Sequence, residues 1–191
     1  MGAKAKWTVP VLTGLLLAGA WLALPEPHVL DLEGNRVDPL ARPRPRATVL
    51  LFLRTDCPIS NRYAPEILRL YQRFGASRVN FWLVYLDQGE TTADIEAHLR
   101  AYNLPRRALR DPNHALVELT GATITPEAAV FTADRTMIYR GRIDDRYIAL
   151  GKARAAPTQR DLEEALTDIL AGQNLPPRTT PAVGCFIADL Q

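Results

Sequence analysis

Residues 47–60, with the sequence ATVLLFLRTDCPIS, decide the fold. The first seven form a continuous apolar run of strand-forming side chains, which is typical of a central strand covered on both faces. After Cys57, apolar residues recur at helical spacing as far as Phe74, and Gly75 follows where a helix is expected to end. The pattern therefore predicts a strand, a polar turn and a helix, with Cys57 at the start of the helix.

The residues that follow alternate between strand and helix patterns. Short apolar runs predict strands, and apolar residues three or four positions apart predict helices. The expected elements are a strand at 79–86, a helix at 92–102 capped by Thr92, a short helix near 113–120, strands at 128–132 and 136–141, and a helix at 159–170. This order predicts an α/β fold with a mixed central sheet flanked by helices.

The composition favours one domain with a leader and a tail. At 191 residues the chain can bury one core. Its 23 basic and 21 acidic residues give a net charge of only +2, spread along the chain, which argues against nucleic-acid binding. The 15 prolines gather near 25–45 and 157–181. We therefore expect a leader at 1–24, an extended lead-in at 25–46, the domain at 47–172 and a proline-rich tail at 173–191.

The leader has the pattern of a signal peptide or a membrane anchor. Residues 7–24 carry no charge and follow Lys4 and Lys6. The run AGA at 18–20 has the small-x-small form of a cleavage site, while the apolar stretch is just long enough to span a bilayer, so both interpretations stay open. Either way, the domain is expected outside the cytoplasm, which would be the periplasm if the cell is Gram-negative. Membrane contact is expected only through this segment.

Cys57 stands where a thiol becomes reactive. The thiolate is the nucleophile, and free amide groups at a helix N-terminus stabilise that anion. Pro58 suits the first helical position because no amide donor is lost there, and the Ser60 hydroxyl can point toward the sulfur. Nearby charges are expected to shift the pKa of Cys57. Arg54 and Arg62 are expected to lower it, and Asp56 is expected to raise it.

Cys185, in the tail, is the second of the two cysteines. An oxidising compartment would allow it to pair with Cys57. Such a bond closes a loop worth about 4 to 5 kcal/mol in the chain-entropy model, which is enough for a purely structural staple. A cysteine on a tail can equally serve as a resolving thiol that releases a mixed disulfide formed at Cys57. A thiol unrelated to Cys57, including one paired with another chain, is the third interpretation.

Other polar residues are expected to be ordinary surface groups. His98 is expected to decorate its helix, and Asp144 and Asp145 to be solvated turn residues. No two histidines have metal-ligand spacing, so neither a metal site nor a cofactor is expected.

Three motifs resemble the thioredoxin superfamily. The run CPIS at 57–60 resembles its redox turn with Ser60 in place of the second cysteine, and Pro65 falls where thioredoxins carry a proline in this helix. The run ITPEAAVF at 124–131 resembles the cis-proline segment, and YRGRID at 139–144 resembles the strand and glycine that follow it. Over about residues 28–171 the chain is identified as a member of the redoxin (AhpC/TSA-like) branch, which implies a thioredoxin-like fold.

The resemblance implies a thiol-disulfide oxidoreductase outside the cytoplasm. Cys57 would be the attacking thiolate and Cys185 the resolving thiol. Three residues would shape the substrate groove, with a cis bond between the last two: Pro58, Thr125 and Pro126. The implied partners are protein thiols and disulfides or small oxidants, together with an unidentified reductant.

The sequence also departs from these relatives. Ser60 removes the ordinary dithiol exchange within the motif. The proline and threonine that peroxiredoxins carry before their cysteine are Leu50 and Arg54 here, which argues against a typical peroxidase site. A peroxidase-like redoxin, a Cu(I)- or partner-binding module without turnover, and a silent domain with a stapling disulfide remain the alternatives.

Overall fold

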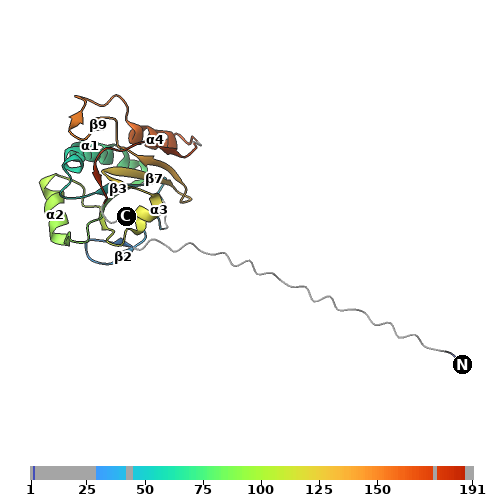
Figure 1. The fold of residues 1–191 in the computed structure, drawn as a ribbon. Coiled ribbons are helices and arrows are strands. Elements are labelled where there is room, and N and C mark those ends of the chain that lie inside the picture. Colours follow the sequence, from blue (N-terminus) through green and yellow to red (C-terminus); the bar gives the residue numbers. More distant parts are fainter. Residues whose placement is uncertain (1, 3–28, 42–44, 174–175, 188–191) are drawn as a thin grey trace.

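The computed structural model describes residues 2, 29–41, 45–173 and 176–187, and Figure 1 shows their arrangement. The fold is α/β, as the sequence predicts, with an eight-stranded mixed sheet and helices packed on its two faces. The predicted leader at 1–24 falls almost entirely outside the described residues. Among the described residues, no helix is long and apolar enough to cross a membrane.

The helices and strands follow the predicted order. The helices are α1 (Pro58–Phe74), α2 (Thr92–Ala101), α3 (Ala115–Thr120) and α4 (Asp161–Leu170), with a 3-10 turn, η1 (Gly75–Ser77). The strands of the main sheet are β1 (Val29–Leu30), β2 (Arg36–Val37), β3 (Ala47–Leu53), β4 (Val79–Tyr85), β5 (Ala108–Arg110), β7 (Glu127–Thr132), β8 (Met137–Gly141) and β11 (Arg178–Thr179). Two small sheets pair β9 (Tyr147–Ala149) with β10 (Lys152–Ala153), and β6 (Ile124–Thr125) with β12 (Cys185–Phe186).

The strand β3 lies at the centre of the main sheet, whose order is β11-β8-β7-β3-β4-β5-β1-β2. It pairs in parallel with β4 and antiparallel with β7, which gives the sheet its mixed character. All seven residues of β3 are buried, as the continuous apolar run predicts for a strand covered on both faces. The carboxyl end of β3 leads directly into the turn that carries Cys57.

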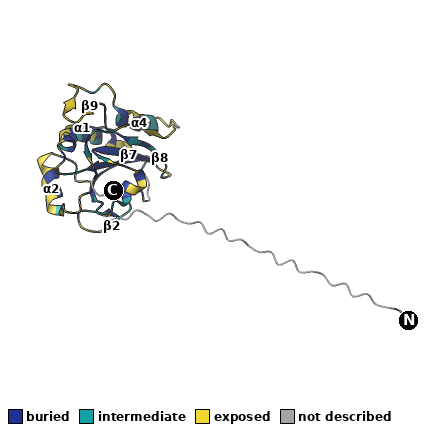
Figure 2. Cartoon of the chain, in the orientation of Figure 1, coloured by how far each residue is buried: buried dark blue, intermediate teal, exposed yellow. Residues whose placement is uncertain are grey.

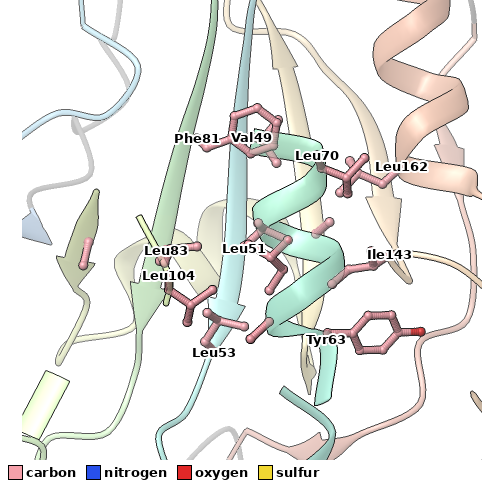
Figure 3. Close-up of a cluster of buried hydrophobic side chains, with 14 of the residues drawn as sticks. Val49, Leu51, Leu53, Tyr63, Leu70, Phe81, Leu83, Leu104, Ile143 and Leu162 are labelled. Carbon is pink, nitrogen blue, oxygen red and sulfur yellow. The ribbon is translucent and has the colours of Figure 1, made fainter. Parts of the chain in front are cut away.

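Alternate residues of β3 enter two separate cores. Leu51 and Leu53 face a first core built with α1, α2 and α4, part of which Figure 3 shows. Leu50 and Phe52 face a second core that includes residues of α3. Figure 2 shows the buried strands at the centre of the molecule, with exposed surface on the outer helices and on β9. Truncating a side chain such as Leu51 to alanine is expected to cost about 2–5 kcal/mol.

The long elements agree with the sequence-based prediction, and the short strands were missed. β3 has the predicted bounds, and α1, β4, α2, β7, β8 and α4 each lie within about two residues of theirs. The predicted cap of α2 was wrong by one residue: Thr91, not Thr92, is the N-cap, and it forms a capping box with Asp94. β1 and β2 arise within the expected lead-in, and β11 and β12 arise within the proline-rich tail.

Candidate active site around two cysteines

Cys57 is the N-cap of α1. Its sulfur accepts a hydrogen bond from the backbone amide of Ser60 at 3.5 Å, so the thiol takes the place that a serine or aspartate side chain usually fills. Pro58 stands at the first helical position, as predicted, where the missing amide donor costs nothing. Cys57 itself is only 1% exposed. The sulfur therefore meets the positive end of a helix while shielded from solvent.

Thr125 lies on the other side of the sulfur. The thiol of Cys57 donates a hydrogen bond to the carbonyl oxygen of Thr125 at 3.2 Å. The Thr125–Pro126 bond is cis, which confirms the expectation drawn from the family motif. Thr125 is itself fully buried. The CPIS motif and the ITP motif, far apart in sequence, therefore meet at one sulfur atom.

The tail brings Cys185 to the same place. β12 pairs antiparallel with β6, so that Cys185 stands opposite Thr125. The Thr125 hydroxyl donates to the carbonyl oxygen of Cys185 at 3.4 Å, and the amide of Ile187 donates to the carbonyl oxygen of Thr123 at 3.0 Å. Both cysteines are reduced, and Cys185 packs against the core cluster that contains Cys57. Cys185, which the sequence could only suggest as a partner, therefore lies beside Cys57.

Thr180 fixes the tail upstream of Cys185. Its amide donates to the carbonyl oxygen of Arg140, and its hydroxyl lies 2.6 Å from the Tyr139 hydroxyl. The amide of Arg142 also donates to the Thr180 hydroxyl, at 3.2 Å. Gly141 has φ +145, and a Cβ there would collide with the backbone of Thr180. The glycine therefore lets the tail lie directly against the end of β8.

The two thiols differ in acidity. Burial raises the pKa of Cys57, but polar interactions with Cys185, with Ser60 and with the Thr125 side chain outweigh it, so the pKa lies below the ordinary thiol value. Burial, the hydrogen bond to Cys57 and the charge of Cys57 raise the pKa of Cys185 to about 12. Cys57 is therefore the more acidic thiol of the pair, and the one that more readily becomes the thiolate.

Ser60 contributes to the site through its amide and its hydroxyl. The amide donates to the Cys57 sulfur, and the side chain lowers the pKa of Cys57, as the sequence suggested. The hydroxyl oxygen is buried and has no well-formed hydrogen bond among the described residues. It is therefore available to stabilise a negative charge on the sulfur.

The charged residues near Cys57 form pairs with one another. Arg54 makes ion pairs with Asp56 at 2.9 Å and with Asp87 at 3.4 Å. The charge of Asp56 contributes to the raised pKa of Cys185, and that of Arg54 opposes it. The side chain of Arg62 lies on an exposed part of α1. Tuning of Cys57 itself by these three predicted residues remains a prediction.

A buried hydrogen-bond chain supports the turn before Cys57, and the sequence did not reveal it. The Tyr85 hydroxyl donates to Nδ1 of His98 at 2.8 Å, and Nε2 of His98 donates to Asn61 at 2.8 Å. The Asn61 amide group then donates to the carbonyl oxygen of Thr55 at 3.0 Å. His98 is 6% exposed, so the expectation that it decorates the helix surface was wrong. Burial lowers the pKa of His98, which keeps the ring neutral.

Glu90 holds the same turn from the other side. One carboxylate oxygen accepts a hydrogen bond from the amide of Thr55 at 2.7 Å. The other oxygen is buried with no hydrogen-bond partner among the described residues. Burial raises the pKa of Glu90. The backbone of Thr55 is therefore fixed at both its amide and its carbonyl group.

Asp144 and Asp145 are structural, and the expectation that they are solvated was wrong. They are 1% and 5% exposed. Asp144 accepts a hydrogen bond from the Tyr63 hydroxyl at 2.6 Å. Asp145 accepts from the amides of Thr158 and Gln159. These carboxylates tie the loop after β8 to α1 and to the start of α4.

Comparisons with known proteins agree with this geometry. The model of the AhpC/TSA family matches residues 23–141, which is more than half of the chain. Solved structures with similar folds include an uncharacterised conserved protein from Geobacillus kaustophilus, with 22% identity, a TM-score of 0.71, and coverage of 84% of this chain and 86% of that one. A hypothetical protein from Sinorhizobium meliloti has 21% identity, a TM-score of 0.71, and coverage of 84% and 88%.

A third similar structure is described as a secreted Mycobacterium tuberculosis disulfide oxidoreductase homologous to E. coli DsbE. It has 18% identity and a TM-score of 0.50, and the alignment covers 77% of this chain and 96% of that one. No curated protein matches the chain significantly. These likenesses show that the fold is thioredoxin-like.

Proposed function

Because the chain belongs to the AhpC/TSA family, we propose that it is an extracytoplasmic thiol-disulfide oxidoreductase with Cys57 as its attacking thiolate and Cys185 as its resolving thiol. The observation that carries the proposal is the placement of two reduced cysteines beside the Thr125 backbone, one of them at a helix N-terminus. Such an arrangement supplies both sulfurs that a complete disulfide exchange requires.

In the first step, the Cys57 thiolate attacks one sulfur of a substrate disulfide. A bond forms between Cys57 and that sulfur, the substrate disulfide breaks, and the second substrate sulfur leaves as a thiolate that takes a proton from solvent. The Ser60 amide stays directed at the Cys57 sulfur throughout. The lowered pKa of Cys57, against the raised pKa of Cys185, makes this sulfur the nucleophile of the pair.

In the second step, Cys185 loses its proton and attacks the Cys57 sulfur, and the substrate leaves as its second thiolate. The pair ends as a Cys57–Cys185 disulfide, and the substrate has gained two electrons. Burial raises the pKa of Cys185, and so do the hydrogen bond and the charge of Cys57. The last two causes disappear once the Cys57 sulfur is bonded to substrate. Cys185 therefore becomes more acidic when it is needed, and an external thiol reductant then restores both cysteines.

The location outside the cytoplasm is supported by the leader. Residues 7–24 are uncharged and follow two lysines. One structural neighbour is described as secreted. An oxidising compartment would also suit a protein that cycles through a disulfide.

Turnover of a model protein disulfide by the full chain, with a thiol reductant in excess, tests the proposal. We expect turnover by the wild type and none by Cys57→Ser, whereas Cys185→Ser should form a mixed disulfide with substrate and stall. If the wild type reduces the protein disulfide no faster than the reductant does without the protein, the proposal is contradicted.

Two neighbouring thiols also favour a second candidate, a two-coordinate Cu(I) site. Stoichiometric Cu(I) binding without disulfide turnover would favour that candidate.

A further inference from the structure

Residues 184–187 of the tail lie along one edge of β6, as a separate peptide that adds a strand to a sheet would. β12 adds to β6 as an antiparallel strand, and backbone hydrogen bonding continues to Ile187. This placement puts Cys185 beside Cys57, a residue that is only 1% exposed. Strand addition to a sheet edge is a general mode of peptide recognition, in which backbone bonds give affinity and side-chain contacts give specificity.

Gly184 is required by a close backbone approach. A Cβ at this position would lie far inside van der Waals contact with the Thr125 carbonyl oxygen, and 2.9 Å from Cγ2 of Ile124. The obstructing carbonyl belongs to the peptide backbone, so it cannot move aside as a flexible side chain can. The residue that precedes Cys185 must therefore lack a side chain.

The two residues after the cysteine have opposite environments. Phe186 is 76% exposed, so its position places no demand on the side chain. Ile187 is 6% exposed and belongs to the second core, together with residues such as Leu50 and Phe131. The position two residues after the cysteine must therefore carry an aliphatic side chain.

We propose that the β6 edge beside Cys57 is a specific binding site for extended polypeptide segments of the pattern Gly-Cys-x-aliphatic, in which the chain's own tail is the resident occupant. A substrate protein with this pattern, its cysteine held in a disulfide, displaces the tail and adds to β6. The Cys57 thiolate bonds to that cysteine sulfur as the substrate disulfide breaks, and the returning tail then brings Cys185 to the mixed disulfide. The inference rests on the proposed function, because it names the substrate class of that thiolate.

The test uses the full chain with Cys185→Ser, which removes the competing internal sulfur. The probe is the hexapeptide AVGCFI, identical to residues 182–187, with its cysteine in a mixed disulfide with thionitrobenzoate. The Cys57 thiolate bonds to the peptide sulfur, the activated disulfide breaks, and the coloured thionitrobenzoate anion leaves. Its release gives the rate of capture directly.

Three variant peptides give the specificity. Changes corresponding to Gly184→Ala and Ile187→Asp should each slow capture roughly tenfold or more, since a clash or a buried charge costs more than about 1.4 kcal/mol. The change corresponding to Phe186→Ala should leave the rate within about twofold, because an exposed side chain contributes little. Equal rates for all four peptides would overturn the inference.

Two further measurements separate this inference from the proposed function. Adding Gly184→Ala to the Cys185→Ser chain should displace the tail from β6 and speed capture of the activated AVGCFI peptide. Circular dichroism checks that this chain is folded. Slower capture by the folded chain would count against displacement. The small reagent dithiobis(nitrobenzoate) tests Cys57 without any peptide. Reaction with this reagent but no peptide preference would overturn the inference alone, whereas no reaction with either would overturn both.

Discussion

The sulfur of Cys57 lies 3.2 Å from the carbonyl oxygen of Thr125, a residue 68 positions further along the chain. This contact joins the N-terminus of α1 to β6. Because β12 pairs with β6, Cys185 stands opposite the same residue, Thr125. The acidity of Cys57 and its access to solvent therefore depend on how the tail is seated.

Removing the Cys185 thiol should raise the pKa of Cys57. Burial opposes ionisation of Cys57, and the hydrogen bond from Cys185 is the largest of the effects that favour it. In Cys185→Ala the midpoint of the alkylation rate against pH should move upward. Phe186→Ala is the matched control, because it changes an exposed neighbour on the same strand. An unchanged or lower midpoint in Cys185→Ala would count against the assigned roles.

Loosening the tail should expose Cys57. Thr180→Val removes the hydroxyl that lies against the Tyr139 hydroxyl and accepts a hydrogen bond from the Arg142 amide. Each lost hydrogen bond is expected to weaken the attachment of the tail by about 0.5–1.5 kcal/mol. Alkylation of Cys57 in the reduced protein should become several-fold faster, since the sulfur is covered when the tail is in place. Thr179→Val, at the exposed neighbouring residue, should react as the wild type does. If both variants alkylate equally fast, Thr180 does not hold the tail.

His98 should make stability depend on pH. Its pKa is lowered by burial, so the unfolded chain binds a proton more readily, and stability falls as the pH drops through the unfolded value of about 6.5. Gln in its place keeps a donor for Asn61 and an acceptor for Tyr85 but does not titrate. Between pH 8 and pH 5.5, the wild type should therefore lose more unfolding free energy than His98→Gln in denaturant titrations. Parallel losses would show that His98 is not the titrating group.

Glu90 should stabilise the turn before Cys57 through its hydrogen bond to Thr55. Glu90→Ala leaves the Thr55 amide without its partner, which is expected to cost about 1–3 kcal/mol of unfolding free energy. Glu90→Gln keeps the acceptor and should cost much less. Because burial raises the pKa of Glu90, the wild type should lose stability relative to Glu90→Gln as the pH rises through the folded value. Equal stability of the alanine and glutamine variants would refute this role.

The sequence predicts the parts of the fold that long apolar patterns specify. The apolar side chains of residues 47–53 can all be buried only in a strand whose sheet is covered on both faces. For this reason β3 was predicted with its observed bounds. The helix after Cys57 has both a periodic face and terminal signals. Strands of two or three residues, such as β6 and β12, are too short for any periodicity, and their pairing depends on contacts remote in sequence.

The candidate site was predicted in part for the same reason. Cys57, Ser60 and the Thr125–Pro126 bond belong to local motifs, so their roles could be anticipated from the sequence. His98 and Glu90 carry no local signal, because only tertiary packing brings them to the backbone around Thr55. Cys185 was named as a partner without a location, since a proline-rich tail does not reveal where it docks.

Disulfide mapping of the full chain, oxidised and then treated with a mild thiol reductant, tests whether Cys57 and Cys185 form a redox-active pair. We predict one intramolecular bond between Cys57 and Cys185 that opens readily, followed by alkylation of Cys57 with a midpoint below that of an ordinary thiol. Two thiols that never pair within one chain would contradict it. So would a Cys57–Cys185 bond that resists the reductant, because such a bond would be a structural staple.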